Sequence, residues 1–344
     1  MLTAMTSVRV VIVDYNGRDV LPACLTSLAT TVAPGIPLTV IDNASPAPSG
    51  ESVPDNFRNR IEIIRSEKNE GYAGAIFRAW TIGNEKYLII ANNDIEFTPG
   101  WLDALVDTAE NSGAYAVSAV IEHENESDLE KSTNASLNPL LYLIPGIFTD
   151  RTKAVYPSGA CFLLRRDRNL KSPPVDPYYF LYFEDVYIGF LLRALGKAVV
   201  QCPDAKVRHV GRHSVSKSNP NFVAFLQERN RLLTQGLFFD CPAFFLMAPM
   251  FLLDSLFKPL ECIYRKKPFW ATASAHWWFL FNWIAIWKKH IALRKLPDFR
   301  AARIFPFMTS KVLPDGFPMA RTVNAVSKLW FKLIGFAVDR EASG

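Results

Sequence analysis

A pair of carboxylates, Glu184-Asp185, stands inside an apolar and aromatic run, Phe180–Tyr187. Asp and Glu rarely occur in such surroundings unless they are paired with another group or take part in chemistry. Apolar surroundings disfavour the charged form of a carboxyl, which raises its pKa and makes it a stronger base. The structural alternative is that acids favour the first turn of a helix. We interpret the pair as the group that takes a proton from an acceptor.

Two further positions have the chemistry of a metal site. Asn92-Asn93-Asp94 follows an apolar stretch, and Asp94 would offer oxygen ligands to Mg²⁺ or Mn²⁺, which often shares phosphate oxygens with its substrate. His209, in the basic cluster Arg208–His213, would supply a neutral imidazole as a further ligand. The alternatives are a capped turn at Asp94 and a structural histidine. A metal-bound diphosphate beside a proton acceptor is the chemistry of sugar transfer.

Further polar side chains have the character of a nucleotide pocket. A carboxylate at a strand end can accept the ring N–H of a pyrimidine base, whereas the alternative is a simple turn. Near Gly71 the backbone can approach a ligand closely, and a helix N-terminus there favours phosphate or hydroxyl groups. The candidate nucleotide-binding residues are Asp14, Tyr15, Asn16, Asp42, Asn43, Asn69, Gly71, Asn92 and Asn93.

The elements that must position these residues alternate between strands and helices. Apolar runs predict strands at 8–13, 38–41, 61–64, 87–91 and 198–202, the last followed by a loop at 203–208. Helical spacing predicts helices at 19–31, 71–83 and about 99–112. This alternation indicates an α/β fold whose ligand lies beyond the carboxyl ends of the strands. The chain has neither a P-loop nor a G-x-G-x-x-G motif, which disfavours a dehydrogenase.

The chain changes character after about residue 234. Between Lys258 and Lys295 stand eight Lys/Arg and one acid, so the rest of the chain is slightly acidic, and Phe269–Trp287 holds five of the eight tryptophans. Leu237–Phe257 is long enough for a membrane span, but its two aspartates oppose one. We expect peripheral or monotopic attachment to an anionic membrane surface. A span and a soluble aromatic interface are the alternatives.

The composition restricts the class of protein. The 344 residues include 49% hydrophobic and 21% charged residues, typical of globular proteins and not of disordered ones. The five cysteines are odd in number and widely spaced, which disfavours a disulfide framework or a zinc site and favours a cytoplasmic setting. No secretory signal is visible at the N-terminus.

Together, these motifs resemble those of the family 2 glycosyltransferases, which have a GT-A fold. The resemblance covers about residues 7–235 and rests on the order and spacing of the motifs. These are Val-Asp-Tyr-Asn-Gly at 13–17, Asp-Asn-Ala-Ser at 42–45, Asn-Glu-Gly-Tyr-Ala-Gly at 69–74, Asn-Asn-Asp at 92–94, Ser-Gly-Ala-Cys at 158–161, Phe-Glu-Asp-Val at 183–186 and the region of His209.

The resemblance implies a role for each matching residue. Asp42 would bind the base, Asp14 to Asn16 would line the nucleotide pocket, and Asp94 would hold the metal with His209. Asp185 would be the catalytic base, beside Glu184. Asn92 replaces the first acid of the family's D-x-D motif, as in rhamnosyltransferase-like members, which suggests a dTDP- or UDP-sugar donor. For the acceptor we expect contacts from Gly159, His213, Arg229 and Arg231.

We therefore expect an inverting glycosyltransferase that moves a rhamnose-like sugar to a polyprenyl-diphosphate-linked saccharide in bacterial cell-surface polysaccharide synthesis. We expect a GT-A domain with a mixed sheet at 1–235, a basic, aromatic, membrane-associating helical segment at 236–300 and a tail at 301–344. The tail's amphipathic stretch 323–338 would use Val326, Trp330 and Leu333 for packing or docking. The protein would work at the cytoplasmic face of the membrane and would not bind nucleic acid. A homodimer is compatible with the sequence. The alternatives are a membrane-bound pseudoenzyme and a nucleotide-binding scaffold.

Overall fold

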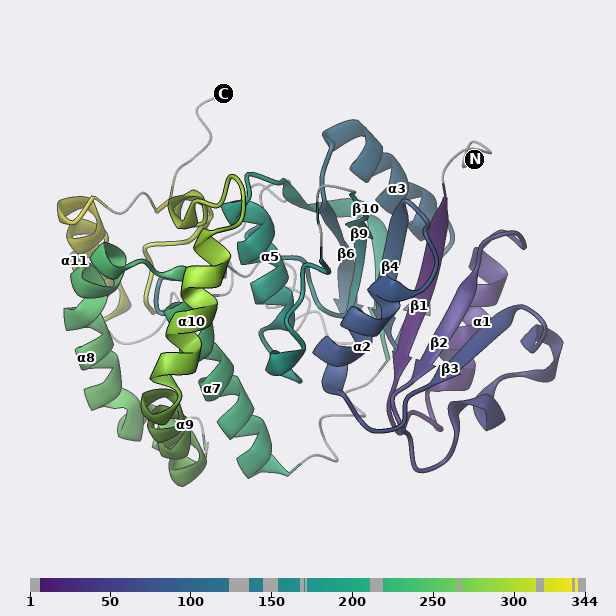
Figure 1. Ribbon diagram of the computed structural model, residues 1–344, viewed down its shortest axis with the longest axis horizontal. Helices are drawn as coiled ribbons and strands as arrows, with labels where there is room; N and C mark the ends of the chain where they lie inside the picture. The colour runs from purple at the N-terminus through teal and green to yellow at the C-terminus, as the bar shows by residue number, and fades with distance from the viewer. Residues whose placement is uncertain are drawn as a thin grey trace. The chain divides into compact units, whose positions relative to one another are not determined.

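The chain builds a mixed eight-stranded sheet from apolar runs that the sequence separates with helices (Figure 1). The strands are β1 (Val8–Asp14), β2 (Leu38–Asp42), β3 (Ile61–Arg65), β4 (Tyr87–Asn92), β5 (Ile95–Phe97), β6 (Ala116–His123), β9 (Cys161–Arg165) and β10 (Val199–His209). Their order is β3-β2-β1-β4-β9-β6-β10-β5. Strands β1 to β4 pair in parallel, whereas β9 and β5 run antiparallel to their neighbours. The expected α/β fold with a mixed sheet is confirmed.

The computed structural model describes residues 7–123, 136–144, 154–167, 170, 172–210, 219–264, 266, 268–313, 319–335 and 338–339. The chain divides into two compact units. The sheet unit comprises Met1–Thr133, Asp150–Leu192 and Lys197–Lys217, and the helical unit comprises Asn134–Thr149, Arg193–Gly196 and Ser218–Gly344. The domain boundary expected at residue 235 falls inside helix α7 (Pro220–Phe238), which belongs to the helical unit.

Helices cover both faces of the sheet. Helices α1 (Leu21–Thr31) and α3 (Trp101–Ser112) bury apolar side chains in one core with alternate residues of the strands, such as Val10 and Ile12. Helix α2 (Gly71–Thr81) contacts β1 and β4 through the other face. Helix α5 (Glu184–Ala194) begins at the carboxylate pair. The first three helices match the predicted ranges because their apolar residues recur at helical spacing.

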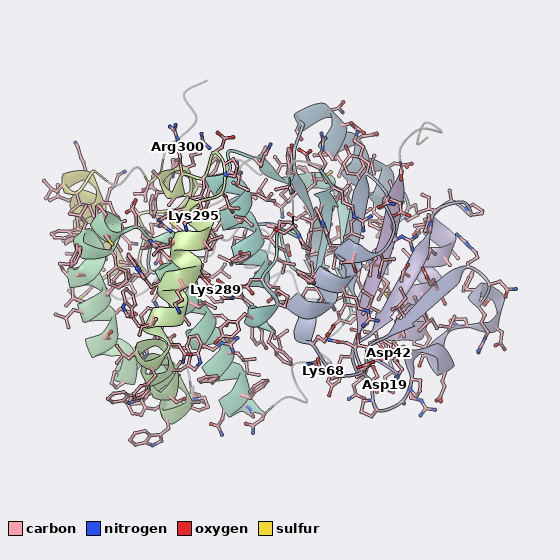
Figure 2. The ribbon with its side chains drawn as sticks, in the orientation of Figure 1. Asp19, Asp42, Lys68, Lys289, Lys295 and Arg300 are labelled. Atoms are coloured by element: carbon pink, nitrogen blue, oxygen red, sulfur yellow. The ribbon has the colours of Figure 1, made fainter. Side chains whose placement is uncertain are left out.

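The parallel register brings polar residues to one edge of the sheet. Asp14 lies opposite Asp42, Asp42 opposite Arg65, and Val13 opposite Asn92. The carboxyl ends of three neighbouring strands therefore present Asp14, Asp42 and Asn92 side by side. Figure 2 labels Asp42, Asp19 and Lys68 at this edge. The sequence predicted this edge as the ligand site, because ligands of open α/β sheets bind there.

Strand β10 corrects one expectation. Residues 203–208 were predicted to form a loop, but the strand continues from Val199 to His209. Its register against β6 shifts between Gln201 and Lys206, so an irregularity inside the strand replaces the loop. Pro203 and the charged residues that follow it are typical of a loop, but a strand also tolerates such residues at a bulge.

The helical unit contains α7, α8 (Cys241–Tyr264), α9 (Phe269–Phe281), α10 (Trp283–Arg294) and α11 (Ala320–Leu333), with the short strands β7 (Ser136–Leu137) and β8 (Leu143–Ile144). The aromatic segment 269–287 is divided between α9 and α10 at Asn282. Within the described ranges, none of the helices has the length and apolar character that a bilayer span requires.

Helix α11 packs through a different face from the apolar one that the sequence predicts for packing or docking, and the docking alternative stays a prediction. Ser327 and Phe331 are buried, whereas Val326 and Leu333, on the face expected to pack, are exposed.

All five cysteines are free, and four of them are buried, so no disulfide contributes to the fold.

Candidate functional site

Asp14 links the ends of β1 and β4. Its buried carboxylate accepts hydrogen bonds from Asn93 Nδ2 at 2.5 Å and from Ser49 Oγ at 2.5 Å. Burial raises its pKa, and the bonds from Asn93 and Ser49 oppose this shift. Gly17 leaves room for the contact, because a Cβ there would lie 2.1 Å from Asn93 Nδ2 and 2.2 Å from Asp14 Oδ1. Asp14 therefore fixes Asn93, and with it the turn that carries Asp94.

Asp42 is held by the loop that follows its own strand. Oδ1 accepts the Ser45 N–H at 2.8 Å, and Oδ2 accepts the Ser49 N–H at 3.1 Å together with the Arg65 guanidinium. Burial acts to raise the pKa of Asp42, but the Ser45 and Ser49 hydrogen bonds and the Arg65 partner outweigh it, so the pKa is lowered. Asp42 is therefore ionised and shapes the loop 43–49. Its expected contact with the base stays a prediction.

Asn43 fastens the second loop of the predicted pocket. Its Nδ2 donates to Asn69 Oδ1 and to the Gly71 carbonyl, both at 3.0 Å, and its Oδ1 accepts the Glu70 N–H at 3.0 Å. Asn69 Oδ1 also accepts the Gly71 N–H at 2.8 Å, so Asn69 satisfies the first amide of α2. The loops that follow β2 and β3 thus meet at the first turn of α2.

Other predicted pocket residues lie at the same edge with their side chains less enclosed. Tyr15 and Asn16 are exposed, and Asn16 has a left-handed φ of 57° and donates its N–H to Ser45 Oγ at 3.0 Å. Asn92 is half-buried and donates its N–H to the Ala160 carbonyl at 3.0 Å. The exposed side chains are the ones that a nucleotide at this edge could contact.

Asp94 and His209, the predicted metal ligands, lie together although 115 positions separate them. Asp94 Oδ1 lies 3.4 Å from His209 Nε2, because His209 pairs with Ile95 across β10 and β5. The Asp94 carboxylate is buried, with 6% exposure. The described residues contain no group of three or more acidic, His or Cys side chains suited to a metal. A carboxylate and an imidazole are ligands that fit a divalent cation, and the phosphate oxygens of a bound substrate could supply the rest of its coordination.

Glu184 and Asp185 occupy the first turn of α5. Asp185 Oδ2 accepts the Gly159 N–H at 3.2 Å and Oδ1 accepts the Val186 N–H at 2.8 Å. Burial raises the pKa of Asp185 to about 6 despite these bonds. Burial and then the neighbouring charge of Asp185 hold the pKa of Glu184 well above its usual value. A raised carboxyl pKa of this kind is expected of a general base that works near neutral pH.

The segment before this pair has a strained backbone. Phe180, Tyr182 and Phe183 have φ angles of 63°, 68° and 66°, which bulky residues rarely adopt. Gly71 packs against this segment, and the Ala73 N–H donates to the Phe180 carbonyl at 3.0 Å. Strain of this kind persists where surrounding contacts enforce it, and it is concentrated at functional sites.

Sequence reasoning missed four residues that hold the site together. Ser45, Ser49 and Arg65 fix Asp42, and Tyr72 donates its hydroxyl to the Gly159 carbonyl at 2.7 Å. Burial raises the pKa of Tyr72, and the charges of Glu184, Cys161, Asp185 and Asp94 add to this effect. The predicted base and the predicted metal ligand therefore both act on one phenol. The one sequence signal for Tyr72 is its position within the motif Gly71-Tyr-Ala-Gly74.

The residues predicted to contact the acceptor fall into different parts of the chain. Gly159 lies against Asp185, with which it shares a hydrogen bond. Arg229 and Arg231 belong to α7 of the helical unit, and His213 lies outside the described residues. The acceptor role of these residues stays a prediction.

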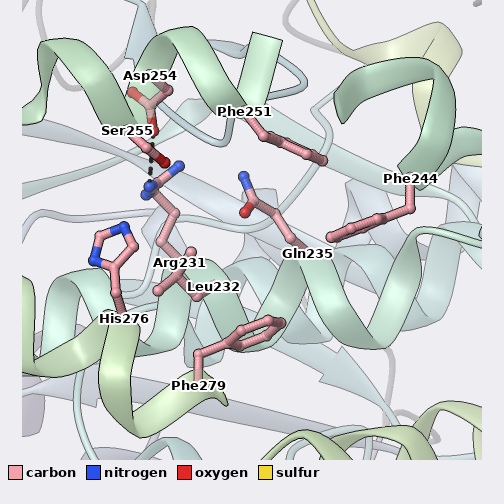
Figure 3. A pocket seen from close by; sticks show the side chains of 9 residues that line it. All are labelled: Arg231, Leu232, Gln235, Phe244, Phe251, Asp254, Ser255, His276 and Phe279. Carbon is pink, nitrogen blue, oxygen red and sulfur yellow. Dashed lines mark hydrogen bonds and ion pairs between the residues drawn. The ribbon is translucent and has the colours of Figure 1, made fainter. Parts of the chain in front are cut away.

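Arg231 is already engaged inside the helical unit. It is 3% exposed, and its guanidinium donates to Glu228 Oε2 at 3.2 Å, Asp254 Oδ2 at 3.0 Å and the Leu140 carbonyl at 2.9 Å. Burial would raise the pKa of Glu228, but the charges of Arg231 and Lys258 lower it to about 2. Figure 3 shows Arg231 facing Asp254. Both residues line a cavity of about 80 Å³ whose walls also include Phe244, Phe251 and Phe279.

Comparisons with known proteins give a family match and similar folds. Residues 9–170 match the model of Glycosyl transferase family 2. An N-acetylglucosaminyl-diphospho-decaprenol L-rhamnosyltransferase of Mycobacterium tuberculosis is 26% identical over 245 residues, which cover 62% of this chain and 80% of that protein.

The solved structures that share the fold include the following two. GalNAc-T7, solved with UDP, GalNAc and Mn²⁺, superposes with a TM-score of 0.54 and 15% identity, over 69% of this chain and 49% of that one, so the match spans about half of its length. S. aureus TarS 1–349 in complex with UDP gives a TM-score of 0.51 and 14% identity, over 96% and 90% of the two chains.

Proposed function

Since the chain belongs to glycosyl transferase family 2 through residues 9–170, we propose that it is an inverting, metal-dependent glycosyltransferase. Its donor would be a nucleotide diphosphate sugar of the dTDP- or UDP-rhamnose type, and its acceptor a polyprenyl-diphosphate-linked saccharide of bacterial cell-surface polysaccharide synthesis. The relative from M. tuberculosis supports this substrate class through its own name, at 26% identity.

One observation carries the proposal: hydrogen bonds, one ion-pair contact and directly neighbouring residues connect the predicted nucleotide, metal and base residues near one edge of the sheet. Asp14 contacts Asn93, the neighbour of Asp94, and Asp94 lies beside His209. On the other side, a chain of contacts runs from Asn43 through Gly71 and Tyr72 to Gly159 and then to Asp185. A donor at this edge would have its diphosphate near Asp94 and its sugar toward Asp185.

The residues of this chain would divide the reaction between them. Asp185 takes the proton of the acceptor hydroxyl while that oxygen bonds to the anomeric carbon, and the bond from that carbon to the diphosphate oxygen breaks on the opposite face. Attack from the opposite face inverts the anomeric configuration. Asp94 and His209 would hold a Mg²⁺ or Mn²⁺ ion, which when bound stabilises the negative charge on the departing diphosphate.

The first test is metal-dependent donor binding. With Mn²⁺ present, we expect one dTDP- or UDP-sugar of a panel to raise the melting temperature by several degrees, because a ligand at 100 times its Kd adds about 2.7 kcal/mol to the stability of the folded state. Asp94→Asn should remove this shift by weakening the metal site. Asp107→Asn, at an exposed position of α3, is the control and should keep it. The measurement is a thermal melt with and without Mn²⁺.

The outcomes separate the parts of the proposal. If no nucleotide sugar stabilises the protein, the donor assignment is wrong. If the shift survives Asp94→Asn and chelation of the metal, the metal assignment is wrong. Binding without transfer to a short-chain lipid diphosphate saccharide, and without hydrolysis of the donor, would instead indicate a nucleotide-binding scaffold.

The helical unit supports the proposed attachment to a membrane surface. On α9, Trp270 and Phe281 expose 82% and 83% of their surface, and Trp277 is also exposed. A further apolar stripe on α8 consists of the exposed Phe245, Leu252 and Ile263, at i, i+7 and i+18. Surfaces of this kind mark interaction sites.

The charge around this surface favours anionic lipid. Residues 262–297 contain seven Lys/Arg and no Asp or Glu. Lys288 and Lys295 are exposed on and just after α10, and Figure 2 shows Lys289, Lys295 and Arg300 along this part of the chain. Exposed tryptophans beside cations are the composition of helices that lie in the headgroup region, with about 1 kcal/mol of attraction for each cation near an anionic surface.

The second test is vesicle binding. We expect the triple variant Trp270→Ser, Trp277→Ser and Phe281→Ser to bind vesicles of anionic phospholipid at least about 10-fold more weakly, because each large side chain that leaves the lipid loses roughly 1.5–3 kcal/mol of apolar burial. Vesicle flotation measures the partition. Phe77→Ser, an exposed aromatic in the sheet unit, is the control. Equal binding by the triple variant and the wild type, or loss of a dimer in place of loss of vesicle binding, would contradict the membrane assignment.

A further inference from the structure

The first turn of α2 contacts both segments that surround the carboxylate of Asp185. On one side, the Tyr72 hydroxyl donates to the Gly159 carbonyl at 2.7 Å, and the Gly159 N–H donates to Asp185 Oδ2 at 3.2 Å. On the other side, the Ala73 N–H donates to the carbonyl of Phe180, four residues before Glu184. One turn of α2 therefore holds, through hydrogen bonds, two of the segments that position Asp185.

We infer that Tyr72 is a positioning residue for Asp185, which acts by fixing the backbone of Gly159 and through it one oxygen of the carboxylate. This inference rests on the proposed function of Asp185 as the base. Tyr72 itself contacts neither the carboxylate nor, on this assignment, the reacting atoms.

The need for such a residue follows from the glycine. A Cβ at position 159 would lie 3.1 Å from Asp185 Oδ2 and 3.5 Å from Asp185 Cβ, so the carboxylate packs directly against the Gly159 Cα. A glycine permits this approach, but it also leaves the two peptide groups beside it free to rotate. The bond from Tyr72 holds the peptide that follows Gly159, and the bond to Asp185 uses the peptide that precedes it. Within the part of the chain that the structure describes, Tyr72 is the side chain that bonds this carbonyl.

Tyr72 is suited to this role because it stays a donor. Burial raises the pKa of the phenol, and nearby negative charges raise it further, so the hydroxyl keeps its proton across the working range of pH. The titratable groups that act on or around Asp185 are Glu184 on the same helix, Tyr72 from α2 and Tyr156 from the segment before β9. Both phenols are neutral at pH 7, since burial also raises the pKa of Tyr156.

The same turn of α2 is held from the nucleotide side. Asn43 donates to the carbonyl of Gly71 at 3.0 Å and accepts the N–H of Glu70. Tyr72 therefore stands directly after the residue that the loop following β2 fastens. The orientation of the base depends on the same turn that shapes the predicted donor pocket.

The test is Tyr72→Phe, which removes one oxygen and keeps the ring. We expect kcat to fall about 10-fold while KM for the donor stays unchanged, because the base is misplaced and the nucleotide contacts remain. The acid side of the pH profile should move upward by about half a pH unit or more, since the Gly159 N–H that favours the ionised carboxylate is no longer held. Tyr87→Phe is the control: Tyr87 is fully buried, and its hydroxyl accepts a bond from Arg165 Nη2 at 3.0 Å, away from Asp185.

A second measurement does not need turnover. In protein labelled with ¹³C at the aspartate carboxyls, the resonance that disappears in Asp185→Asn identifies Asp185, and its titration midpoint can be followed by NMR. An upward shift in Tyr72→Phe but not in Tyr87→Phe supports the inference. If both variants lose similar stability and neither moves this midpoint, Tyr72 is merely structural and the inference is wrong. This readout holds even if no sugar transfer is found, so it separates this inference from the proposed function.

Discussion

Replacing Asp185 with Asn is expected to lower kcat by about 10²- to 10⁴-fold, the usual contribution of a positioned base. The amide has nearly the same shape, and its oxygen can keep the bond from the Val186 N–H, but it cannot take a proton from the acceptor hydroxyl. Donor binding should change little, because the predicted nucleotide contacts lie at the ends of β1, β2, β3 and β4 and not on α5. The measurements are transfer rate and donor-induced thermal stabilisation of the same preparation.

The pH dependence gives this prediction a second check. Burial raises the pKa of Asp185 to about 6, and the base works only when ionised, so wild-type kcat should rise with pH through about 6 and then level off. The sign for stability is opposite. Because the folded-state pKa is raised, the carboxyl favours folding only while protonated, and this advantage is lost as the pH rises from about 4 through 6. Above pH 6 the Asn variant should therefore be more stable, by up to about 3 kcal/mol.

Denaturant unfolding between pH 4 and pH 8 measures this difference, with Asp107→Asn as the matched control. Two results would contradict the assignment of Asp185 as the base. One is a variant with near-normal transfer, and the other is a pH profile of the wild type that stays flat between pH 5 and pH 7.

Gly71→Ala is expected to have the largest effect on stability among single methyl additions at glycine. Gly71 has φ of 71°, and an added Cβ would lie 2.2 Å from the oxygen and 2.6 Å from the carbonyl carbon of Phe180. These are backbone atoms that cannot rotate away. Left-handed backbone costs Ala about 1–2 kcal/mol, and the overlap should add about 1–3 kcal/mol more. Because Phe180 leads directly to the carboxylate pair, transfer activity should fall as well.

Gly113→Ala is the matched control. Gly113 ends α3 with φ of 67°, nearly the angle of Gly71, but no heavy atom lies within 4 Å of the position of its added Cβ. This variant should lose only the backbone contribution of about 1–2 kcal/mol. Denaturant unfolding of both variants measures the difference, which isolates the contact with Phe180. Equal losses in the two variants would show that this contact contributes nothing.

The sequence predicted the sheet edge well because its signals are local. Alternating or continuous apolar residues end at Asp14, Asp42 and Asn92, and these positions are neighbours as soon as the strands pair in parallel. The pairing of Asp94 with His209 also followed from the motifs, although the strand through residues 203–208 was missed. A bulge inside a strand leaves a polar stretch that looks like a loop.

The contacts between residues of different motifs could not be predicted from the sequence. Tyr72 and Gly159 are 87 positions apart and meet only because α2 packs over β4 beside β9. Arg65 lies just beyond the predicted strand 61–64, and only the register of β3 on β2 shows that it lies against Asp42. Buried Arg231 of α7 forms an ion pair with Asp254 of α8, a contact that the sequence does not reveal. Periodicity reports which face of an element is apolar, but it does not report which partner that face meets.

The ion pairs inside the helical unit fix the rotation of α8 about its axis. Asp254 is bonded to Arg231, and Lys258, one turn later, lies 3.2 Å from Glu228. At 100° per residue, Asp254 stands almost diametrically opposite Leu252 and Ile263. The charges of Asp254 and Lys258, which would be costly in lipid, are thus paired inside the helical unit. Their pairing fixes the orientation of α8 so that its apolar face points outward.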